Sequence, residues 1–381
     1  MSGKNNIINM KYLIVQNIIA PYRTSLFNSL AKKGLDFKVL YMRLTEDDRS
    51  WNVDLSQIEY PYEIFNGFYK VILNHHVHWN PSLIKYVKNN KDARVILGSG
   101  WNDLDIMAIC MLKRLHIVKN ELIFWSEANY LTNGSRNDNF FKRTLRSFVF
   151  KSGCGCFIVP GQMSVETFKR WNIPVKSHIL LPNVIEEEVF GSLQKGEKST
   201  GLPHVIMPVR LLEKIKGIVN FFNAIGSDNV RKAIFHVLGD GEDKEMIESW
   251  IRKNNYQGSI ILEGFKQKNE LVSFYSISHF FVLPSFSDQS PLCLVEAAYS
   301  RLPLLISNRC GNRFETLVDG KNGYMFDPDN KTSIKEAYEK MLYCRDNWVA
   351  MGEYSRQLYD QNFKQSVVIE KFIKGLIDSE K

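Results

Sequence analysis

The sequence predicts an α/β protein made of two domains, each with a doubly wound parallel sheet. The chain has 381 residues, which is more than one compact core usually takes up. Short apolar runs alternate with amphipathic segments of helical period in each half, as expected for repeated β-loop-α units. A polar, glycine-containing stretch at 191–201 separates the two series and is typical of a linker. Two such domains leave a cleft between them, where ligands often bind.

The first half begins the alternation with a buried-strand pattern and ends it with another. Its strands are expected at 12–16, 37–41, 68–73, 94–98, 121–125, 156–159 and 179–181. Its helices are expected at 25–33, 81–88, 104–115, 140–150 and 164–171. Residues 43–62 show no clear period and are interpreted as loop.

The second half restarts the same alternation after the linker. Its strands are expected at 205–209, 233–238, 259–262, 280–283 and 304–306. Its helices are expected at 218–225, 242–253, 268–276, 292–300, 331–342, 344–358 and 365–379. The predicted organisation is an N-terminal domain at 1–190, the linker at 191–201, a C-terminal domain at 202–364, and a last helical segment at 365–381.

Composition favours a soluble cytoplasmic protein. Hydrophobic residues make up 44% of the chain and charged residues 24%. The longest apolar runs have strand length, too short to span a bilayer, and the N-terminus lacks the apolar core and cleavage site of a signal peptide. The six cysteines are scattered apart from Cys154 and Cys156, so reduced thiols are expected.

Positive charge is concentrated in the first half. Residues 1–185 hold 24 Lys and Arg against 14 Asp and Glu, a net charge of +10, whereas residues 186–381 hold 25 against 27. This asymmetry indicates an anionic partner, such as a phosphorylated acceptor, a membrane surface or nucleic acid, unless it is chance surface charge. The basic, aromatic segment 140–151 fits a helix lying on a membrane or a helix packed on the sheet. No nucleic-acid-binding motif is present, so nucleic acid is not expected.

Two carboxylates lie where two predicted strands end in polar loops. Asp288 and Glu296 are eight positions apart, across the loop that follows the strand at 280–283. The apolar run at 302–306 also ends in a polar loop, at 308–312. The carboxyl edge of a parallel sheet is where α/β proteins bind ligands, so a small phosphate-bearing ligand is expected here. An ordinary βαβ unit with polar turns is the alternative.

The spacing around these carboxylates matches a known pattern. The matching positions are Asp288-x7-Glu296, Ala297, Pro303, Gly311 and Glu315-x4-Gly320-x2-Gly323. The pattern resembles the C-terminal domain of family 4 glycosyltransferases, retaining enzymes of the GT-B fold, in which two Rossmann-like domains face a central cleft. Further similarities lie at Arg210 to Gly217, His236 to Gly241, Gly264-Phe265, Pro160-Gly161 and Pro182-Asn183. The resemblance covers nearly the whole chain and is strongest from 200 to 327. It implies that the C-terminal helix at 365–381 crosses back to the N-terminal domain.

The resemblance implies that catalytic residues of the C-terminal domain act on a nucleotide diphosphate sugar. Arg210 and Lys216 would neutralise the diphosphate as it leaves, Arg by forking onto its oxygens and Lys as a point charge. Asp288 would contact the hydroxyls of the transferred sugar. A solvated pair of basic residues is the alternative for Arg210 and Lys216.

The resemblance also implies a donor-binding set. The helix that begins near Leu292 would aim N–H groups at the anion, and Glu296 would accept hydrogen bonds from the ribose. Gly264, Phe265 and Lys266 would hold the base. The alternative for Glu296 is an exposed helix residue.

The chain departs from the family pattern at three places. Asp288 stands where Glu is usual, and Pro291 stands where a glycine is usual, which removes a backbone donor. Gln289 and Ser290 are the expected compensation, with Ser290 adding a hydroxyl. Lys216 follows Arg210 by six residues rather than five, which leaves Lys214 as a rival phosphate ligand.

The N-terminal domain is expected to hold the acceptor. Asn17 and Arg23 follow the first strand and are candidates for the cleft floor, and Gly100 and Trp101 form a turn that would line the acceptor side. Glu127 follows the strand at 121–125, where relatives often have a histidine, and is the candidate polar group at the reaction centre. A capping role for Glu127 is the alternative.

No metal site is predicted. Asp103 and Asp105 match a metal-binding D-x-D, but they precede a helix and are interpreted as helix-start acids. His75, His76 and His78 lack a partner carboxylate or cysteine pair and are interpreted as a loop cluster or an acceptor contact.

The predicted function is transfer of a sugar from a UDP- or GDP-linked donor to an acceptor hydroxyl with retention of configuration. No cofactor beyond the donor substrate is expected. The acceptor is expected to be a lipid-linked or cell-surface polysaccharide precursor, met at the inner face of the cytoplasmic membrane. Two alternatives stay open: a nucleotide-sugar epimerase or hydrolase on the same fold, and a catalytically weakened subunit that only binds a sugar nucleotide.

Overall fold

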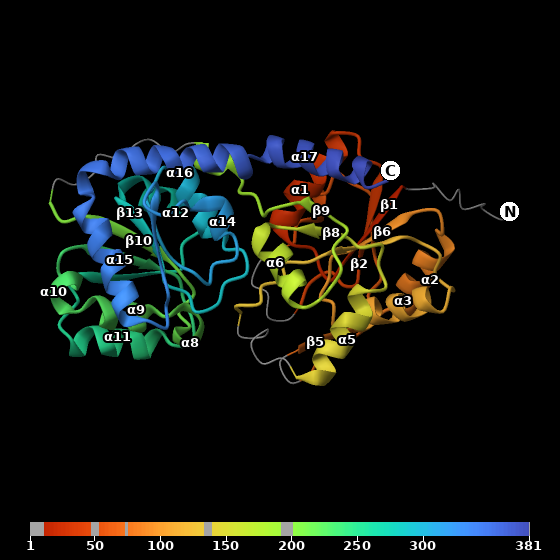
Figure 1. The fold of residues 1–381 in the computed structure, drawn as a ribbon, viewed down its shortest axis with the longest axis horizontal. Helices are drawn as coiled ribbons and strands as arrows, with labels where there is room; N and C mark the ends of the chain where they lie inside the picture. The colour runs from red at the N-terminus through yellow and green to blue at the C-terminus, as the bar shows by residue number, and fades with distance from the viewer. Residues whose placement is uncertain (1–10, 47–52, 73–74, 133–138, 192–200, 381) are drawn as a thin grey trace.

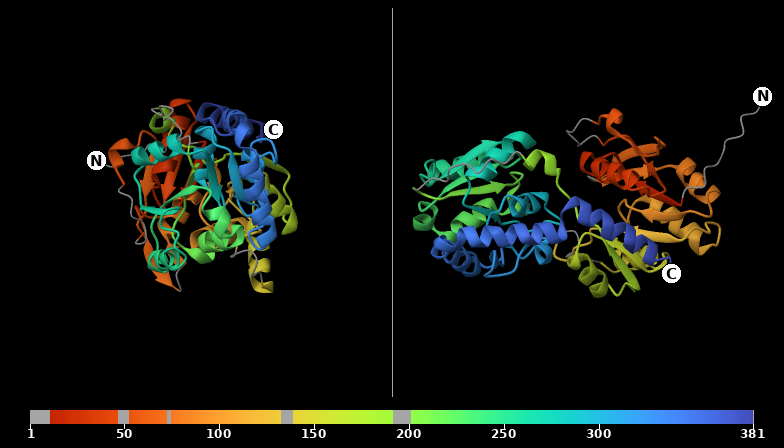
Figure 2. Two further views of the ribbon diagram at one scale, coloured as in Figure 1. Left: turned by 90° about the vertical axis from the view of Figure 1, so that its left-hand side faces the viewer. Right: turned by 90° about the horizontal axis from the view of Figure 1, so that it is seen from above.

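A computed structural model describes residues 11–46, 53–72, 75–132, 139–191 and 201–380 of the chain, which form two domains side by side (Figures 1 and 2). Each domain is built on a parallel sheet covered by helices on both faces. The predicted α/β class with two doubly wound parallel-sheet domains is confirmed. The described residues also include a two-stranded antiparallel hairpin.

The N-terminal sheet has the strand order β3-β2-β1-β6-β7-β8-β9. Its strands are β1 (Tyr12–Gln16), β2 (Phe37–Tyr41), β3 (Tyr62–Ile64), β6 (Arg94–Leu97), β7 (Leu122–Trp125), β8 (Cys156–Val159) and β9 (Ser177–Leu180). Its helices are α1 (Pro21–Lys32), α2 (Pro81–Asn89), α3 (Leu104–Arg114), α5 (Phe140–Phe150) and α6 (Gln162–Arg170). Every residue of β1 is buried, because helices cover both faces of a parallel sheet.

The C-terminal sheet has the strand order β12-β11-β10-β13-β14-β15. Its strands are β10 (His204–Pro208), β11 (Ile234–Leu238), β12 (Ile260–Gly264), β13 (Phe280–Leu283), β14 (Leu304–Ser307) and β15 (Gly323–Phe326). Its helices are α7 (Glu187–Gly191), α8 (Glu213–Lys216), α9 (Ile218–Ile225), α10 (Ser227–Val230), α11 (Lys244–Lys253), α12 (Lys268–Ile277), α13 (Leu292–Tyr299), α14 (Arg313–Thr316), α15 (Lys331–Tyr343) and α16 (Trp348–Asn362).

Each sheet reverses its strand order at one point, and these points position the site. In the N-terminal sheet the chain runs outward from β1 to β3 and then returns to place β6 on the other side of β1. In the C-terminal sheet the same reversal falls between β10 and β13. Loops diverge at such switch points and leave a crevice at the carboxyl ends of the strands.

The segment around residues 68–79 differs from its prediction. β4 (Phe68–Ile72) pairs with β5 (His75–Trp79) as an antiparallel hairpin. The histidine run therefore lies on a strand, and its interpretation as a loop cluster is wrong. His76 bonds the hydroxyl of Tyr69 across the hairpin at 2.8 Å, and this cross-strand pairing is not visible in the local sequence.

The chain enters the C-terminal domain earlier than predicted. Val184 belongs to the core of the N-terminal domain, whereas Ile185 and Phe190 belong to that of the C-terminal domain. The ring of Phe190 packs on Tyr275 and Tyr299. The boundary predicted after residue 190 is therefore too late, because α7 packs with the second domain. Most of the predicted linker, residues 192–200, lies outside the described residues.

The last helix, α17 (Gln365–Asp378), lies on the N-terminal domain (Figure 1). The side-chain amide of Gln365 donates to Ser29 in α1 at 2.9 Å. Four apolar side chains of α17 are buried in the N-terminal core: Val368, Ile369, Phe372 and Leu376. The chain thus crosses between the domains twice.

Candidate functional site

A partly buried ion pair lies at the switch point of the C-terminal sheet. Lys216 ends α8, which follows β10, and Asp288 lies in the loop after β13. Their Nζ and Oδ2 atoms are 2.5 Å apart, and the side chains are 19% and 15% exposed. Burial disfavours the ammonium charge, but the neighbouring Asp288 carboxylate outweighs burial and raises the pKa of Lys216. Lys216 is therefore a fixed cation at the carboxyl edge of the sheet.

Gly217 makes this placement of Lys216 possible. Its φ of +63° lies in the left-handed region, which turns the chain from α8 directly into α9. A Cβ at this position would lie 3.0 Å from the Pro284 carbonyl oxygen and from the Phe286 ring. The turn at Gly217 thus places the side chain of Lys216 next to the loop after β13.

The other two basic candidates of this segment are more exposed. Lys214 is exposed on α8, so the structure brings Lys216 rather than its rival to Asp288. The Arg210 side chain is 65% exposed, with its guanidinium 4.0 Å from Glu242. Arg210 follows β10 at the same sheet edge but does not join the Lys216–Asp288 pair.

Glu296 lies one turn inside α13, the helix that starts at Leu292. Its Oε2 atom accepts a hydrogen bond from the Tyr275 hydroxyl at 2.8 Å. Burial, helped by the charge of Glu296, raises the pKa of Tyr275 well above its usual value, so the hydroxyl keeps its proton and donates. Sequence reasoning missed Tyr275, because an aromatic residue in a helix is normally read as core.

The residues predicted to hold the base lie at the end of edge strand β12. Gly264 has a φ of +74°, and the Phe265 ring that follows it is 68% exposed. Lys266 lies over the Phe274 ring, 5.8 Å from its centroid. Ser290 is partly buried in the loop before α13. Both segments follow the carboxyl ends of strands of the C-terminal sheet, residues 264–266 at β12 and Ser290 after β13.

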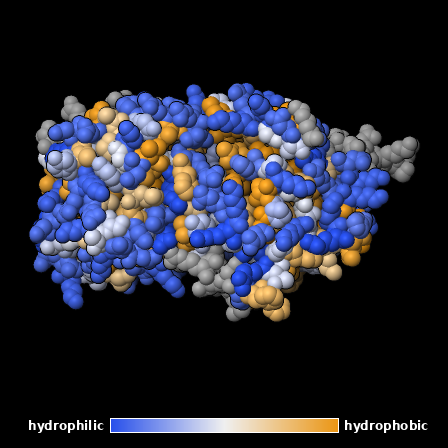
Figure 3. Space-filling view, in the orientation of Figure 1, coloured by the Kyte–Doolittle hydropathy of each residue, from blue (hydrophilic) through white to orange (hydrophobic). Residues whose placement is uncertain are grey.

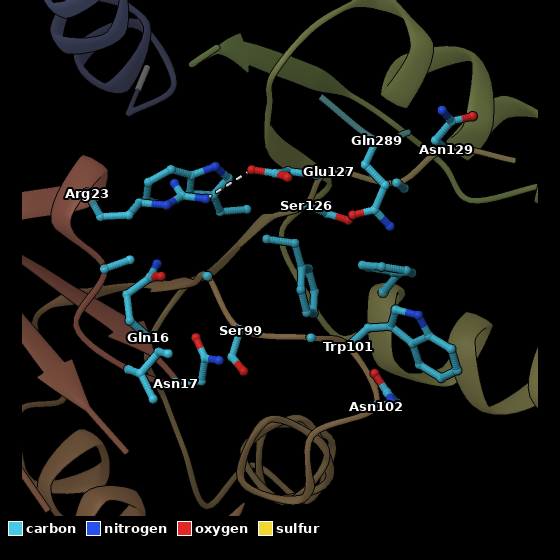
Figure 4. A pocket seen from close by; sticks show the side chains of 18 of the residues that line it. Gln16, Asn17, Arg23, Ser99, Trp101, Asn102, Ser126, Glu127, Asn129 and Gln289 are labelled. Atoms are coloured by element: carbon cyan, nitrogen blue, oxygen red, sulfur yellow. Dashed lines mark hydrogen bonds and ion pairs between the residues drawn. The ribbon is translucent and has the colours of Figure 1, made fainter. Parts of the chain in front are cut away.

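A cavity of about 600 Å³ lies at the carboxyl ends of β1, β6 and β7 (Figure 4). It brings together all the predicted acceptor-side residues and Glu127; these residues are Asn17, Arg23, Gly100, Trp101 and Glu127. Gln289 of the C-terminal domain also lines the cavity. Because Gln289 follows Asp288 directly, one loop reaches both the ion pair and the cavity.

Glu127 is held in place at the cavity wall. Its Oε1 atom accepts hydrogen bonds from Arg23 at 3.1 Å and from the Asn183 side chain at 3.2 Å. The Arg23 guanidinium lies 3.7 Å from the centroid of the Trp125 ring, and Arg23 is buried. Figure 4 shows this pair lying along one side of the cavity. The arrangement fixes Glu127 without a capping role.

Side chains of Asn129 and Glu315 make contacts that join the two domains. The side-chain amide of Asn129 donates to the carbonyl oxygens of Asp288 at 3.3 Å and Arg309 at 3.4 Å. The Glu315 carboxylate accepts from the Gln162 backbone N–H at 2.6 Å, and burial raises the pKa of this glutamate. Sequence reasoning did not assign a role to Asn129 or Gln162, since contacts between distant segments carry no local signal.

The acidic and histidine motifs take part in the fold. Asp103 caps α3 by accepting from the Asp105 N–H. Buried Asp105 accepts from both the backbone and the side chain of Asn80 at 2.7 Å. His78 bonds Asp103 at 3.1 Å. Across the described ranges, no group of three or more potential ligand side chains could hold a metal ion.

Comparison with known proteins agrees with this architecture. The solved structure of Anabaena HepE in complex with UDP superposes with a TM-score of 0.73, at 12% identity, over 97% of this chain and 100% of that one. Such structural neighbours are GT-B glycosyltransferases. The fold is GT-B.

Residues 192–358 of this GT-B chain match the family model described as "Glycosyl transferases group 1". An uncharacterized glycosyltransferase of Methanocaldococcus jannaschii is 29% identical over 37% of the chain. The alpha-monoglucosyldiacylglycerol synthase of Acholeplasma laidlawii is 30% identical over 32% of it. The matched regions span 38% and 29%, about a third, of these curated relatives.

Proposed function

We propose that this GT-B protein is a retaining glycosyltransferase that moves a hexose from a nucleotide diphosphate sugar to an acceptor hydroxyl. The observation that carries the proposal is the Lys216–Asp288 pair at the C-terminal switch point, on the loop that also reaches the cavity of the other domain through Gln289. The loop thus has a cation at one end, which suits the diphosphate of a donor, and a cavity at the other, which suits an acceptor. The cavity favours transfer over a donor-only epimerase or hydrolase.

The proposed mechanism is front-face displacement, by analogy with the family 4 glycosyltransferases that the sequence resembles. The bond between the sugar and the diphosphate oxygen breaks, and negative charge grows on the diphosphate. Lys216 and Arg210 stabilise that charge, and N–H groups at the start of α13 add their dipoles. The leaving phosphate accepts the proton of the acceptor hydroxyl, so neither a protein base nor a metal ion is required. Asp288 holds Lys216 charged and in place while contacting the sugar.

UDP or GDP is the proposed leaving group, with no further cofactor. The match to the model "Glycosyl transferases group 1" lies mostly over the C-terminal domain, and HepE was solved with UDP. Glu296 is proposed to bind the ribose hydroxyls, and the 264–266 segment the base. The exposed Phe265 ring offers a flat face on which a base can stack.

A nucleotide screen by thermal shift tests the donor half of the proposal. UDP or GDP at about 100 times its Kd adds about 2.7 kcal/mol of stability, which raises Tm by about 5–10 °C. The shift should persist with EDTA present, because the cations of the site belong to the protein. Lack of stabilisation by any nucleoside diphosphate would contradict the proposal, and a shift lost in EDTA would contradict metal independence.

The proposed acceptor is a lipid-linked or surface polysaccharide precursor, reached by peripheral contact with the cytoplasmic face of the membrane. No helix among the described residues is long and apolar enough to cross a bilayer. The first turn of α5 exposes Phe140 at 73% and Phe141 at 84%, beside Lys142 and Arg143. Figure 3 shows a pale orange patch at this tip of the N-terminal domain.

Three side chains in the C-terminal half of α5 pack inward. Arg146 is buried with its guanidinium 3.7 Å from the centroid of the Trp171 ring, so this arginine cannot reach lipid phosphates. Val149 and Phe150 are buried on the sheet. Exposed side chains therefore lie in the N-terminal half of α5, which can contact a membrane, and the buried ones lie in its C-terminal half, which packs on the domain.

The double substitution Phe140→Ser with Phe141→Ser should reduce vesicle binding at least tenfold. Each phenyl ring contributes about 1.5–3 kcal/mol when buried, and 1.4 kcal/mol is a factor of ten. Co-sedimentation with vesicles containing phosphatidylglycerol measures the loss. The control is Tyr343→Ser with Val349→Ser, which removes two exposed apolar side chains from the C-terminal domain. Equal binding by both double variants would contradict contact through α5.

A further inference from the structure

Gln16 is a buried polar residue at the cavity whose side chain is only partly used by the fold. It ends β1, is 4% exposed, and lines the cavity. Its amide nitrogen has no hydrogen-bond partner among the described residues. A buried amide donor without a partner destabilises a fold, so its retention at a cavity points to a ligand oxygen that completes it.

Gly98, the residue after β6, makes room for this amide. A Cβ at position 98 would lie 1.9 Å from the Gln16 nitrogen, well inside van der Waals contact. The Gln16 side chain therefore occupies the space that any other residue at 98 would fill. Figure 4 shows Gln16 beside Asn17 and Ser99 on the cavity floor.

The charges at the cavity exclude one class of ligand. Arg23 and Glu127 are the charged side chains among its described lining residues, and they pair with each other at 3.1 Å. A phosphate or carboxylate ligand needs a cation or several N–H donors whose charge is not already matched. The cavity thus suits an uncharged ligand.

The remaining lining groups suit a ring with hydroxyls on its edge and C–H groups on its face. Side-chain amides of Asn17, Asn102 and Gln289 and the Ser99 hydroxyl can donate to or accept from such hydroxyls. The partly exposed Trp101 indole lies at the opposite side of the cavity from Arg23 in Figure 4 and offers an apolar face. Few polar groups with an aromatic wall are typical of a site that fixes ligand orientation.

We propose that this cavity binds an uncharged sugar ring of the acceptor and that the Gln16 amide donates a hydrogen bond to one of its oxygens. The inference rests on the proposed function, because it names the chemical class of the group that receives the transferred sugar. Gln16 is then a specificity-determining residue, and any phosphate or lipid of the acceptor lies outside the cavity.

Saturation-transfer NMR on the full chain tests this inference with methyl glycosides of glucose, galactose and N-acetylglucosamine as probes. Inorganic phosphate and glucose 6-phosphate are the anionic comparison. At least one neutral glycoside should bind, and more tightly than either anion. Binding of phosphate in preference to every glycoside, or no glycoside binding, would overturn the proposal. UDP titration of the same sample tests the donor site separately. If the proposed function is wrong, UDP does not bind, whatever the glycosides do.

Variants assign the contact to Gln16. Gln16→Met keeps the length of the side chain but removes the amide, and it should weaken glycoside binding about tenfold while leaving UDP binding unchanged. Gln16→Glu replaces the amide donor with a carboxylate acceptor of the same shape and should also weaken glycoside binding. It provides the test if the methionine variant does not fold. Gln357→Met, at an exposed glutamine of α16, is the matched control. Glycoside affinity equal to wild type in a folded Gln16 variant would refute its role.

Discussion

Replacing Lys216 by alanine is expected to lower the rate of glycosyl transfer by a factor of about 10²–10³. The lysine is the partly buried cation at the sheet edge where the diphosphate is proposed to leave, and the Asp288 carboxylate keeps it charged. Its loss removes the stabilisation of the growing negative charge and leaves the Asp288 carboxylate to repel the diphosphate. A coupled assay of nucleoside diphosphate release measures the rate.

The chain provides a matched control two residues away. Lys214→Ala removes an exposed lysine from the same short helix and should change the rate less than twofold, since exposed charges are screened by solvent. Thermal unfolding of both variants separates loss of chemistry from loss of folding. Equal effects of the two substitutions, or a larger effect at Lys214, would refute the assignment of the phosphate ligand to Lys216.

Glu296→Ala is expected to weaken the binding of UDP about 10- to 100-fold. Hydrogen bonds to a charged group contribute about 1.5–3 kcal/mol each, and 1.4 kcal/mol is a factor of ten. The carboxylate is oriented by the Tyr275 hydroxyl at 2.8 Å, so it is already placed for a ribose before the nucleotide arrives. Isothermal titration with UDP measures the change.

Ribose analogues make the same experiment specific. Wild-type protein should bind UDP more tightly than 2′-deoxy or 3′-deoxy UDP, and Glu296→Ala should bind UDP and at least one of these analogues equally. Glu336→Ala, at an exposed glutamate of α15, should behave as wild type. If the Glu296 variant still discriminated against both analogues, the ribose contact would belong to another residue.

The sequence was sufficient for the architecture because the two parallel sheets are encoded locally. β13 is a continuous apolar run, β1 is one up to its last residue, Gln16, and every residue of both strands is buried. The period of the helices between strands is visible without any tertiary information. The edge that carries the site follows from topology, since loops at the carboxyl ends of parallel strands must meet. Asp288 and Lys216 could thus be brought to one edge from their positions alone.

What the sequence did not reveal depends on contacts between distant segments. Gln16 is 82 residues from Gly98, and only their proximity in space shows that the glycine makes room for the amide. Gln289 was expected to compensate on the donor side, yet it lines the cavity with the N-terminal domain. The boundary near residue 190 was misplaced because α7 has no composition that marks it as part of the following domain.

The position of α17 sets the order in which the protein can be completed during synthesis. The N-terminal domain is translated before the C-terminal domain, but four of its core side chains belong to a helix that is translated after both. Until α17 leaves the ribosome, the α1 face of that domain lacks these side chains and exposes apolar surface to water. The C-terminal domain has its whole core by Phe363. The first domain to be made is therefore the last to finish folding.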